Sequence, residues 1–105
     1  MAQFSVHRNN HARTRGDIPY LLDLQADILS ILATRLVVPL YRMESLGSRP
    51  MARLTPVVRF QGQELVAMVP ELAGIPGKEL GPALGDLAAD RNELIQALDL
   101  LVTGF

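Results

Sequence analysis

The last twenty residues, Asp86–Phe105, carry the one unambiguous helical pattern in this sequence. Apolar residues recur there at three- and four-residue steps, which places them on one side of an α-helix. Asp86 can cap the first turn, and Gly104 stands where a helix turns left-handed and ends. We therefore expect the end of the helix to project, with the apolar Phe105 either against a partner or folded back onto its own domain. The apolar face comprises Leu87, Leu94, Ile95, Leu98, Leu101 and Val102.

The composition predicts one small domain spanning residues 1–105. Apolar residues make up 49% of the chain, but there are only two Tyr, three Phe and no Trp, so the core has to be aliphatic. The net charge of −1 argues against a general nucleic-acid binder. The absence of Cys excludes disulfides and fits a reducing compartment. Neither a signal peptide nor a membrane span is recognisable, so we expect a cytoplasmic protein without membrane contact.

Several short antiparallel strands are predicted before the helix. A Gln61-Gly62 turn between two apolar runs is a strong hairpin signal. Residues 25–34 are compatible with either a short helix or a loop apex. Strands followed by one helix favour a mostly β fold, a curled sheet or small barrel with the helix packed on one side. The expected strands are Gln3–Val6, Ile18–Leu24, Arg35–Leu40, Thr55–Phe60, Gln63–Val69 and a short Leu72–Ile75.

No constellation of catalytic residues is recognisable in the sequence. His7 and His11 are interpreted as solvated loop residues rather than metal ligands, because no Cys or acidic residue accompanies them at ligand spacing. Asp23 and Asp27 are interpreted as two surface carboxylates, and Arg35 as a strand-end arginine that keeps its charged head in water. Phosphate-binding glycine motifs and serine-nucleophile motifs are absent. The sequence thus favours a binding protein over an enzyme, with neither metal nor cofactor.

A basic segment lies between the first two predicted strands. Residues 7–16 contain Arg8, Arg13 and Arg15, which form a positive patch on a nearly neutral chain. Such a patch could attract an acidic peptide. The alternative is an ordinary solvated hairpin loop.

Short motifs in a fixed order connect this chain with a known family. They include D-x-Q-x-D-I at residues 23–28, R-x-V-x-P-L at residues 35–40 and a glycine at the penultimate position. On these residues the chain resembles, over essentially its full length, the CcdB family of bacterial toxins, which poison DNA gyrase. The other matching residues are Gln3, Phe4, Val6, Leu54, Pro56, Val57, Val58, Ala73, Pro76, Gly81, Asp86, Leu87, Asn92, Ala97 and Leu100.

The resemblance implies an SH3-like curled antiparallel barrel with a C-terminal helix, of the CcdB/MazF-like kind, assembled as a symmetric homodimer. It also implies an activity without catalysis. Such a dimer enters the A subunits of DNA gyrase while the enzyme holds cleaved DNA, and blocks religation. It needs no cofactor, does not recognise a nucleic-acid sequence directly, and is neutralised by an acidic, largely disordered antitoxin.

The same resemblance implies the site residues. The antitoxin would contact Arg8, Arg13 and Arg15. Within the gyrase-binding set, Thr103 stands where the family usually has Trp, and Asp99 where it typically has Asn. The gyrase-binding residues would be Ile28, Leu29, Asp99, Val102, Thr103, Gly104 and Phe105.

Two other functions stay open on the sequence. One is a MazF-like endoribonuclease toxin, because MazF-like toxins share the barrel; RNA cleavage would then depend on residues such as Thr34 or Arg35. The other is a non-toxic homologue that has lost gyrase binding and binds only the antitoxin. Thr103, in place of the family's Trp, is its main support.

Overall fold

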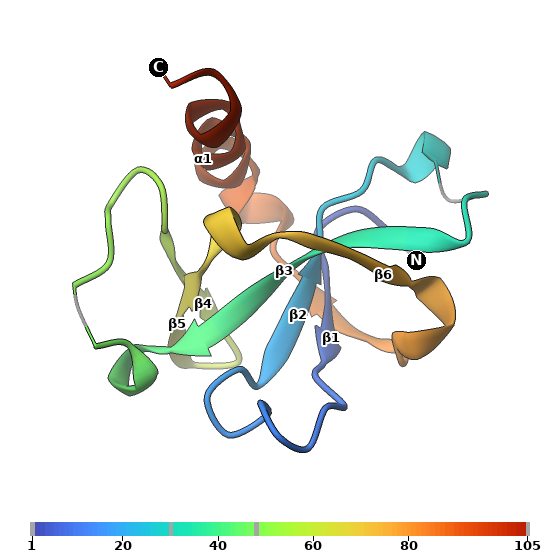
Figure 1. The fold of residues 1–105 in the computed structure, drawn as a ribbon, viewed down its shortest axis with the longest axis horizontal. Coiled ribbons are helices and arrows are strands. Elements are labelled where there is room, and N and C mark those ends of the chain that lie inside the picture. Colours follow the sequence, from blue (N-terminus) through green and yellow to red (C-terminus); the bar gives the residue numbers. More distant parts are fainter. Residues whose placement is uncertain (1, 30, 48, 105) are drawn as a thin grey trace.

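A computed structural model describes residues 2–29, 31–47 and 49–104. It shows a curled antiparallel sheet with one α-helix lying across its upper end (Figure 1). The strands are β1 (Ser5–Arg8), β2 (Tyr20–Asp23), β3 (Thr34–Arg42), β4 (Val57–Phe60), β5 (Gln63–Ala67), β6 (Ala73–Pro76) and β7 (Ala83–Asp86). The helix is α1 (Arg91–Thr103), and the single 3-10 turns are η1 (Asp27–Leu29), η2 (Met43–Ser45), η3 (Val69–Glu71), η4 (Gly77–Glu79) and η5 (Ala88–Asp90).

The long strand β3 is the centre of the sheet. The strand order is β4-β5-β3-β2-β1-β7, and β6 pairs with the first half of β3. All pairs are antiparallel. One edge of β3 thus pairs with β6 at its beginning and with β5 at its end, so the sheet bends along this strand. This arrangement confirms the predicted fold class, a mostly β curled barrel with one C-terminal helix.

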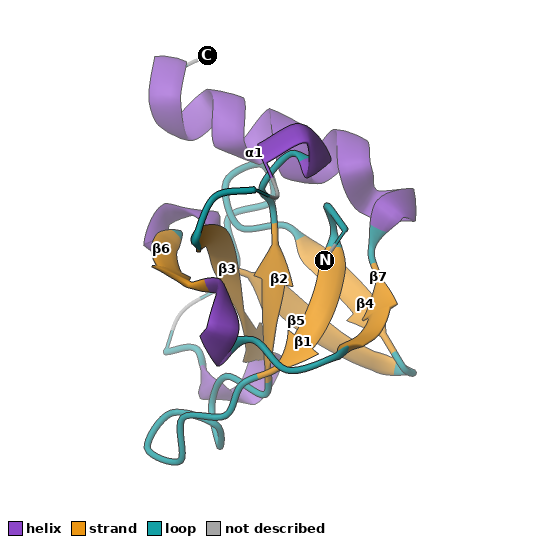
Figure 2. Ribbon diagram, turned by 90° about the vertical axis from the view of Figure 1, so that its right-hand side faces the viewer, coloured by secondary structure: helices purple, strands orange, loops and turns teal. Residues whose placement is uncertain are grey.

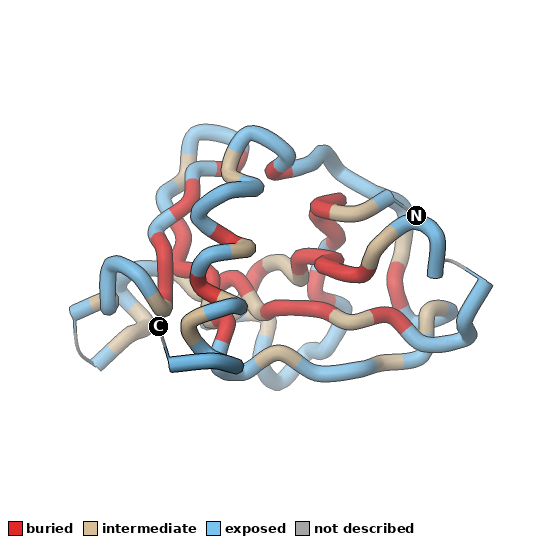
Figure 3. Tube along the Cα trace, turned by 90° about the horizontal axis from the view of Figure 1, so that it is seen from above, coloured by how far each residue is buried: buried red, intermediate tan, exposed pale blue. Residues whose placement is uncertain are grey.

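The core is mainly aliphatic, with two buried Phe side chains, and it follows the two-residue period of the strands. Val38 and Leu40 of β3 point inward together with Leu22 of β2, and all three are fully buried. The helix lies across the upper end of the sheet, as Figure 2 shows, and adds the buried Leu94 and Ala97 to this core. Buried residues accordingly gather along the central strands and the inner side of the helix (Figure 3).

Two turn predictions are confirmed by backbone geometry. Gln61 and Gly62 both have positive φ, 52° and 78°, which suits a tight hairpin between β4 and β5. Gly104 has φ 80° and its N–H donates to the Leu100 carbonyl at 2.9 Å, so it ends α1 in the left-handed conformation.

The N-terminal end of the predicted helix is wrong. Asp86 ends strand β7 and pairs with Ser5 of β1, and the sequence analysis did not predict this strand. Its carboxylate accepts a hydrogen bond from the N–H of Ala88, the first residue of η5, at 2.9 Å, and α1 begins later, at Arg91. Pairing with a distant strand therefore overrides the local helical pattern at these residues. Within the described residues, no helix is both long and apolar enough to span a bilayer.

Candidate functional site

An apolar tip extends from the sheet between β2 and β3. It comprises residues 26–33, of which residue 30 lies outside the described residues. Ile28 is 86% exposed and Ile31 is 88% exposed, while Leu29 and Leu32 are about half exposed. Large apolar side chains at such exposures are typical of a contact surface when they cluster. The predicted site residues Ile28 and Leu29 therefore lie in solvent, and sequence analysis missed their neighbours Ile31 and Leu32.

A buried ion pair lies at the base of the tip. The Arg35 Nη2 atom lies 2.7 Å from the Asp23 Oδ2 atom, and the Arg35 Nε–H donates to the same oxygen at 2.9 Å. The Arg35 side chain is 2% exposed and that of Asp23 is fully buried. It is the one ion pair within residues 2–29, 31–47 and 49–104. Each charged group compensates the hydration that the other loses on burial. The ion pair therefore links the end of β2 to the start of β3, on either side of the tip.

Gln25 extends this network into the tip. Its backbone N–H donates to Asp23 Oδ1 at 2.9 Å, and its Nε2–H donates to the Leu29 carbonyl at 2.8 Å. Its Oε1 accepts from the Leu36 N–H at 3.1 Å. The same side chain therefore holds η1 to the start of β3. These bonds define the polar base of the tip: Asp23, Gln25 and Arg35.

The surface positions predicted for Asp23 and Arg35 are wrong. Both side chains alternate onto the face of the sheet opposite the aliphatic core, and the register sets Asp23 opposite Val37, two residues after Arg35. The Asp23 and Arg35 side chains are thus close enough to form an ion pair, and both are buried. Asp27 is exposed, as predicted, and its Oδ1 accepts from the Gln3 N–H at 2.5 Å.

The end of α1 forms a second exposed apolar surface. Leu98 still packs against the core, but Leu101 is 39% exposed and Val102 is 74% exposed. The Thr103 hydroxyl donates to the Asp99 carbonyl at 2.7 Å, so its polar group is satisfied within the helix. The predicted site residues Asp99, Val102, Thr103 and Gly104 are all exposed, whereas Phe105 lies outside the described residues. The tip and the helix end lie on the same upper side of the molecule (Figures 1 and 2).

The basic loop, residues 9–17, lies at the opposite end of the sheet from α1 (Figure 1). Asn9 is buried and anchors it, since its Nδ2 donates to Thr14 Oγ1 at 3.0 Å and to the Ile18 carbonyl at 2.8 Å. The predicted antitoxin-contacting residues are at this end: Arg8, which was predicted in the loop, is the last residue of β1 and is exposed, Arg13 is exposed and Arg15 is half-buried.

The interpretation of His7 as a solvated loop residue is wrong. His7 lies in β1 and is fully buried. Its Nδ1–H donates to the Gly81 carbonyl at 2.8 Å, because a carbonyl can only accept, and its Nε2 lies 2.8 Å from Ser5 Oγ. His7 therefore fixes the segment before β7 to β1. His11 is exposed, as predicted, and no three His, Asp or Glu side chains of the described residues gather as a metal-ligand set.

The fold is a small, curled, antiparallel β-sheet with one C-terminal helix, and it exposes two apolar surfaces, the tip and the end of α1. The family model described as CcdB protein matches residues 3–104. The chain therefore belongs to the CcdB family.

Several solved structures share this fold. One of them is described as an endoribonuclease in complex with its cognate antitoxin from mycobacterial species. The TM-score is 0.74, with 97% of this chain and 94% of that chain covered. At 17% sequence identity, the likeness supports a common fold and leaves function to be argued from the surfaces of this chain.

Proposed function

We propose that this protein is the toxin of a bacterial toxin–antitoxin module that binds the A subunit of DNA gyrase and traps the cleaved gyrase–DNA complex. Membership of the CcdB family supports the toxin class. The observation that carries the gyrase assignment is the exposure of apolar side chains at both surfaces that the family resemblance implies, with Ile28 86% and Val102 74% exposed. The protein acts by binding and not by catalysis, in the cytoplasm where gyrase works.

The proposed active form is a homodimer. A two-fold axis doubles every surface of the chain, so two tips and two helix ends can face the two A subunits of gyrase at once. Burial of these apolar side chains in the complex would supply the main part of the binding free energy. The basic loop at the other end of each chain stays free for an acidic antitoxin peptide, which would contact Arg8, Arg13 and Arg15.

Thr103 sets the expected strength of gyrase binding. Trp is the family's usual residue at this position, and loss of such an anchor often costs about 2 kcal/mol or more. The Thr103 hydroxyl bonds its own helix and offers little apolar area. The wider apolar tip, which includes Ile31 and Leu32, can offset part of this loss.

The test measures binding of the purified protein to an N-terminal fragment of gyrase A. We expect Ile28→Ser and Val102→Ser each to weaken binding at least about tenfold, because each removes a large apolar contact. Val57→Ser is the matched control, since Val57 is also exposed but lies on β4. All three variants should keep the wild-type melting temperature within a few degrees.

Accumulation of cleaved gyrase–DNA complexes during induced expression in bacteria is the functional readout. Unchanged affinity in both the Ile28 and the Val102 variants, with wild-type binding intact, would contradict the proposed site. A soluble protein that binds an antitoxin but neither binds gyrase nor arrests growth would instead be the non-toxic homologue.

An endoribonuclease is the second candidate, and the fold shared with a protein described as an endoribonuclease favours it. Against it, the Arg35 side chain is 2% exposed and bonded to Asp23, so it is not available to an RNA phosphate. Thr34 is exposed. RNA cleavage by the purified protein that is lost in Thr34→Ala would establish this activity, and the absence of cleavage on structured and single-stranded RNA would remove it.

A further inference from the structure

Arg42 adds a further cation to the end of the sheet that carries the basic loop. Its Nε–H donates to the Gly16 carbonyl at 2.8 Å, and its backbone N–H donates to the Asp17 carbonyl at 2.9 Å. The loop thus leaves β1, reaches the end of β3 and only then enters β2. Arg42, which is half-buried, therefore holds the last part of the basic loop against β3.

Arg42 and Arg8 lie on the same face of the sheet. The strand register sets Arg8 of β1 opposite Tyr20 of β2, and Tyr20 opposite Leu40 of β3. Arg42 is two residues beyond Leu40, so its side chain lies on the same face as that of Arg8. Two strand spacings and two residue steps separate the two Cα atoms, which is roughly 12 Å. One short peptide can therefore contact both guanidinium groups.

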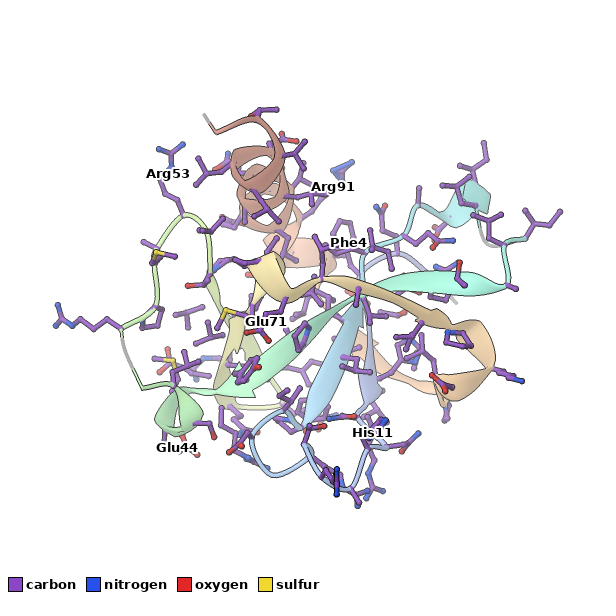
Figure 4. The ribbon with its side chains drawn as sticks, in the orientation of Figure 1. Phe4, His11, Glu44, Arg53, Glu71 and Arg91 are labelled. Carbon is purple, nitrogen blue, oxygen red and sulfur yellow. The ribbon has the colours of Figure 1, made fainter. Side chains whose placement is uncertain are left out.

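The arginines at this end of the sheet have no carboxylate partner. The one ion pair within residues 2–29, 31–47 and 49–104 is the buried pair at the base of the tip. Asp17 and Glu44, the carboxylates nearest to Arg42 in the sequence, are exposed and form no ion pair with it. Figure 4 shows Glu44 and His11 on the lower side of the molecule, where this surface lies. The positive charge is therefore not neutralised within the described chain; it comes from Arg8, Arg13, Arg15 and Arg42, which we call the arginine cluster.

We propose that the arginine cluster is one binding site for an acidic peptide, and that Arg42 extends this site from the basic loop onto β3. The inference rests on the proposed antitoxin function and adds Arg42 to it. Because the Arg42 Nε–H already bonds the loop, its two Nη groups remain for a carboxylate of the peptide. A nucleic acid fits less well, because the basic loop has no Phe, Tyr or Trp on which bases could stack, and because Asp17 and Glu44 would repel phosphates.

The test is a titration of the ¹⁵N-labelled full chain with two capped peptides, hexaglutamate and hexaglutamine. We expect saturable shifts of the Arg13, Arg15 and Gly16 amide signals with hexaglutamate and none with hexaglutamine. Arg42→Gln should weaken hexaglutamate binding about fivefold, the scale of one partly screened ion pair, and Arg42→Lys should stay within about twofold of the wild type because it keeps the charge. Arg53→Gln is the matched control, because it removes the same charge from an exposed residue on the upper side of the molecule (Figure 4).

Two further readouts separate charge from loop position. The amide of Arg42→Gln can still donate to the Gly16 carbonyl, so the Gly16 and Asp17 signals of the free variant should stay near those of the wild type. The loss of affinity between about 50 and about 300 mM NaCl should be smaller in Arg42→Gln than in the wild type, because one screened ion pair is missing.

Arg13→Gln distinguishes failure of the inference from failure of the proposed function. If Arg13→Gln weakens hexaglutamate binding and Arg42→Gln does not, the antitoxin site stands and Arg42 is not part of it. If neither variant weakens binding, or if hexaglutamate does not bind, the arginine cluster is not the antitoxin site and both ideas are wrong. Equal losses in Arg42→Gln and Arg42→Lys would also overturn the inference, since the charge of Arg42 would then not matter. Tighter binding of a thymidine hexanucleotide than of hexaglutamate would make a nucleic acid the partner instead.

Discussion

The tip and the end of α1 are both exposed and apolar, but they are attached to the fold in different ways. The tip rests on a polar base, in which Asp23, Gln25 and Arg35 join η1 to two strands through an ion pair and side-chain hydrogen bonds. The helix end has no such base. Its support is apolar packing through Leu94 and Leu98, and beyond these residues the helix continues on its own backbone bonds.

The difference shows two solutions to one problem. Exposed apolar side chains gain no free energy from burial, so other interactions have to hold the backbone of their segment in place. An irregular loop needs side-chain partners for its backbone groups, whereas a helix satisfies them internally and can therefore project. We expect substitutions at the polar base to disorder the tip and leave the helix end intact, and substitutions under α1 to do the reverse.

The largest effect is expected from breaking the buried ion pair. Arg35→Met leaves the Asp23 carboxylate buried without a partner, which should lower the free energy of unfolding by about 3–5 kcal/mol. Urea unfolding monitored by circular dichroism measures this change. The double variant Asp23→Leu with Arg35→Met should recover most of the loss, because it removes both charges and keeps apolar volume.

If the double variant recovers its free energy of unfolding, it also separates the effect of the ion pair on stability from its effect on the position of the tip. If the base positions the tip, the double variant should be stable and still bind gyrase A more weakly than the wild type. A stable double variant with wild-type gyrase affinity would mean that the ion pair supports the sheet alone.

Removing the apolar support of the helix should have the next largest effect. Leu94 is fully buried, and Leu94→Ala should cost about 3 kcal/mol through lost burial and a residual cavity. Leu101→Ala is the comparison on the same helix face; as Leu101 is 39% exposed, its cost should be within about 0.5 kcal/mol. Thermal unfolding of both variants checks the prediction, and equal losses would mean that packing extends to the helix end.

A smaller effect is expected from Gln25→Met, which keeps the side-chain length but loses both polar atoms. The Leu36 N–H and the Leu29 carbonyl then lose their partners, at a cost of about 1–2 kcal/mol. Amide hydrogen exchange should accelerate in the tip, at Ile28 and Leu29, and stay unchanged in α1. Uniform acceleration over the whole chain would show that Gln25 stabilises the fold without a specific effect on the tip.

The sequence predicted the features that depend on nearby residues. The helical face, the Gly104 end and the Gln61-Gly62 turn each follow from a few consecutive positions, and the structure has all three. The polar base was missed because Arg35 lies twelve residues from Asp23, and only the register between β2 and β3 makes them neighbours. The burial of His7 was missed for the same reason: its carbonyl partner is 74 residues away.

The candidate surfaces also differ in whether they could be predicted from the sequence. Exposure of Ile28 and Val102 could be predicted, since the family resemblance implies that both are contact residues. The cavity of about 610 Å³ on the outer face of the sheet could not be predicted, because its lining residues come from the basic loop, β2, β3 and β6, which are far apart in the chain.

A small effect should come from Gly104→Ala. The φ of 80° at this position is strained for a residue with a Cβ, yet a Cβ here would meet nothing within 4 Å, so the whole cost is that of the backbone. We expect a loss of about 1 kcal/mol at most, with Gly104→Asn recovering part of it because Asn tolerates the left-handed conformation. Gyrase affinity should fall in the alanine variant by more than its stability does, since a helix that no longer ends at Gly104 redirects the residue after it. Equal affinity in all three proteins would mean that the direction of the chain beyond Thr103 does not matter for gyrase binding.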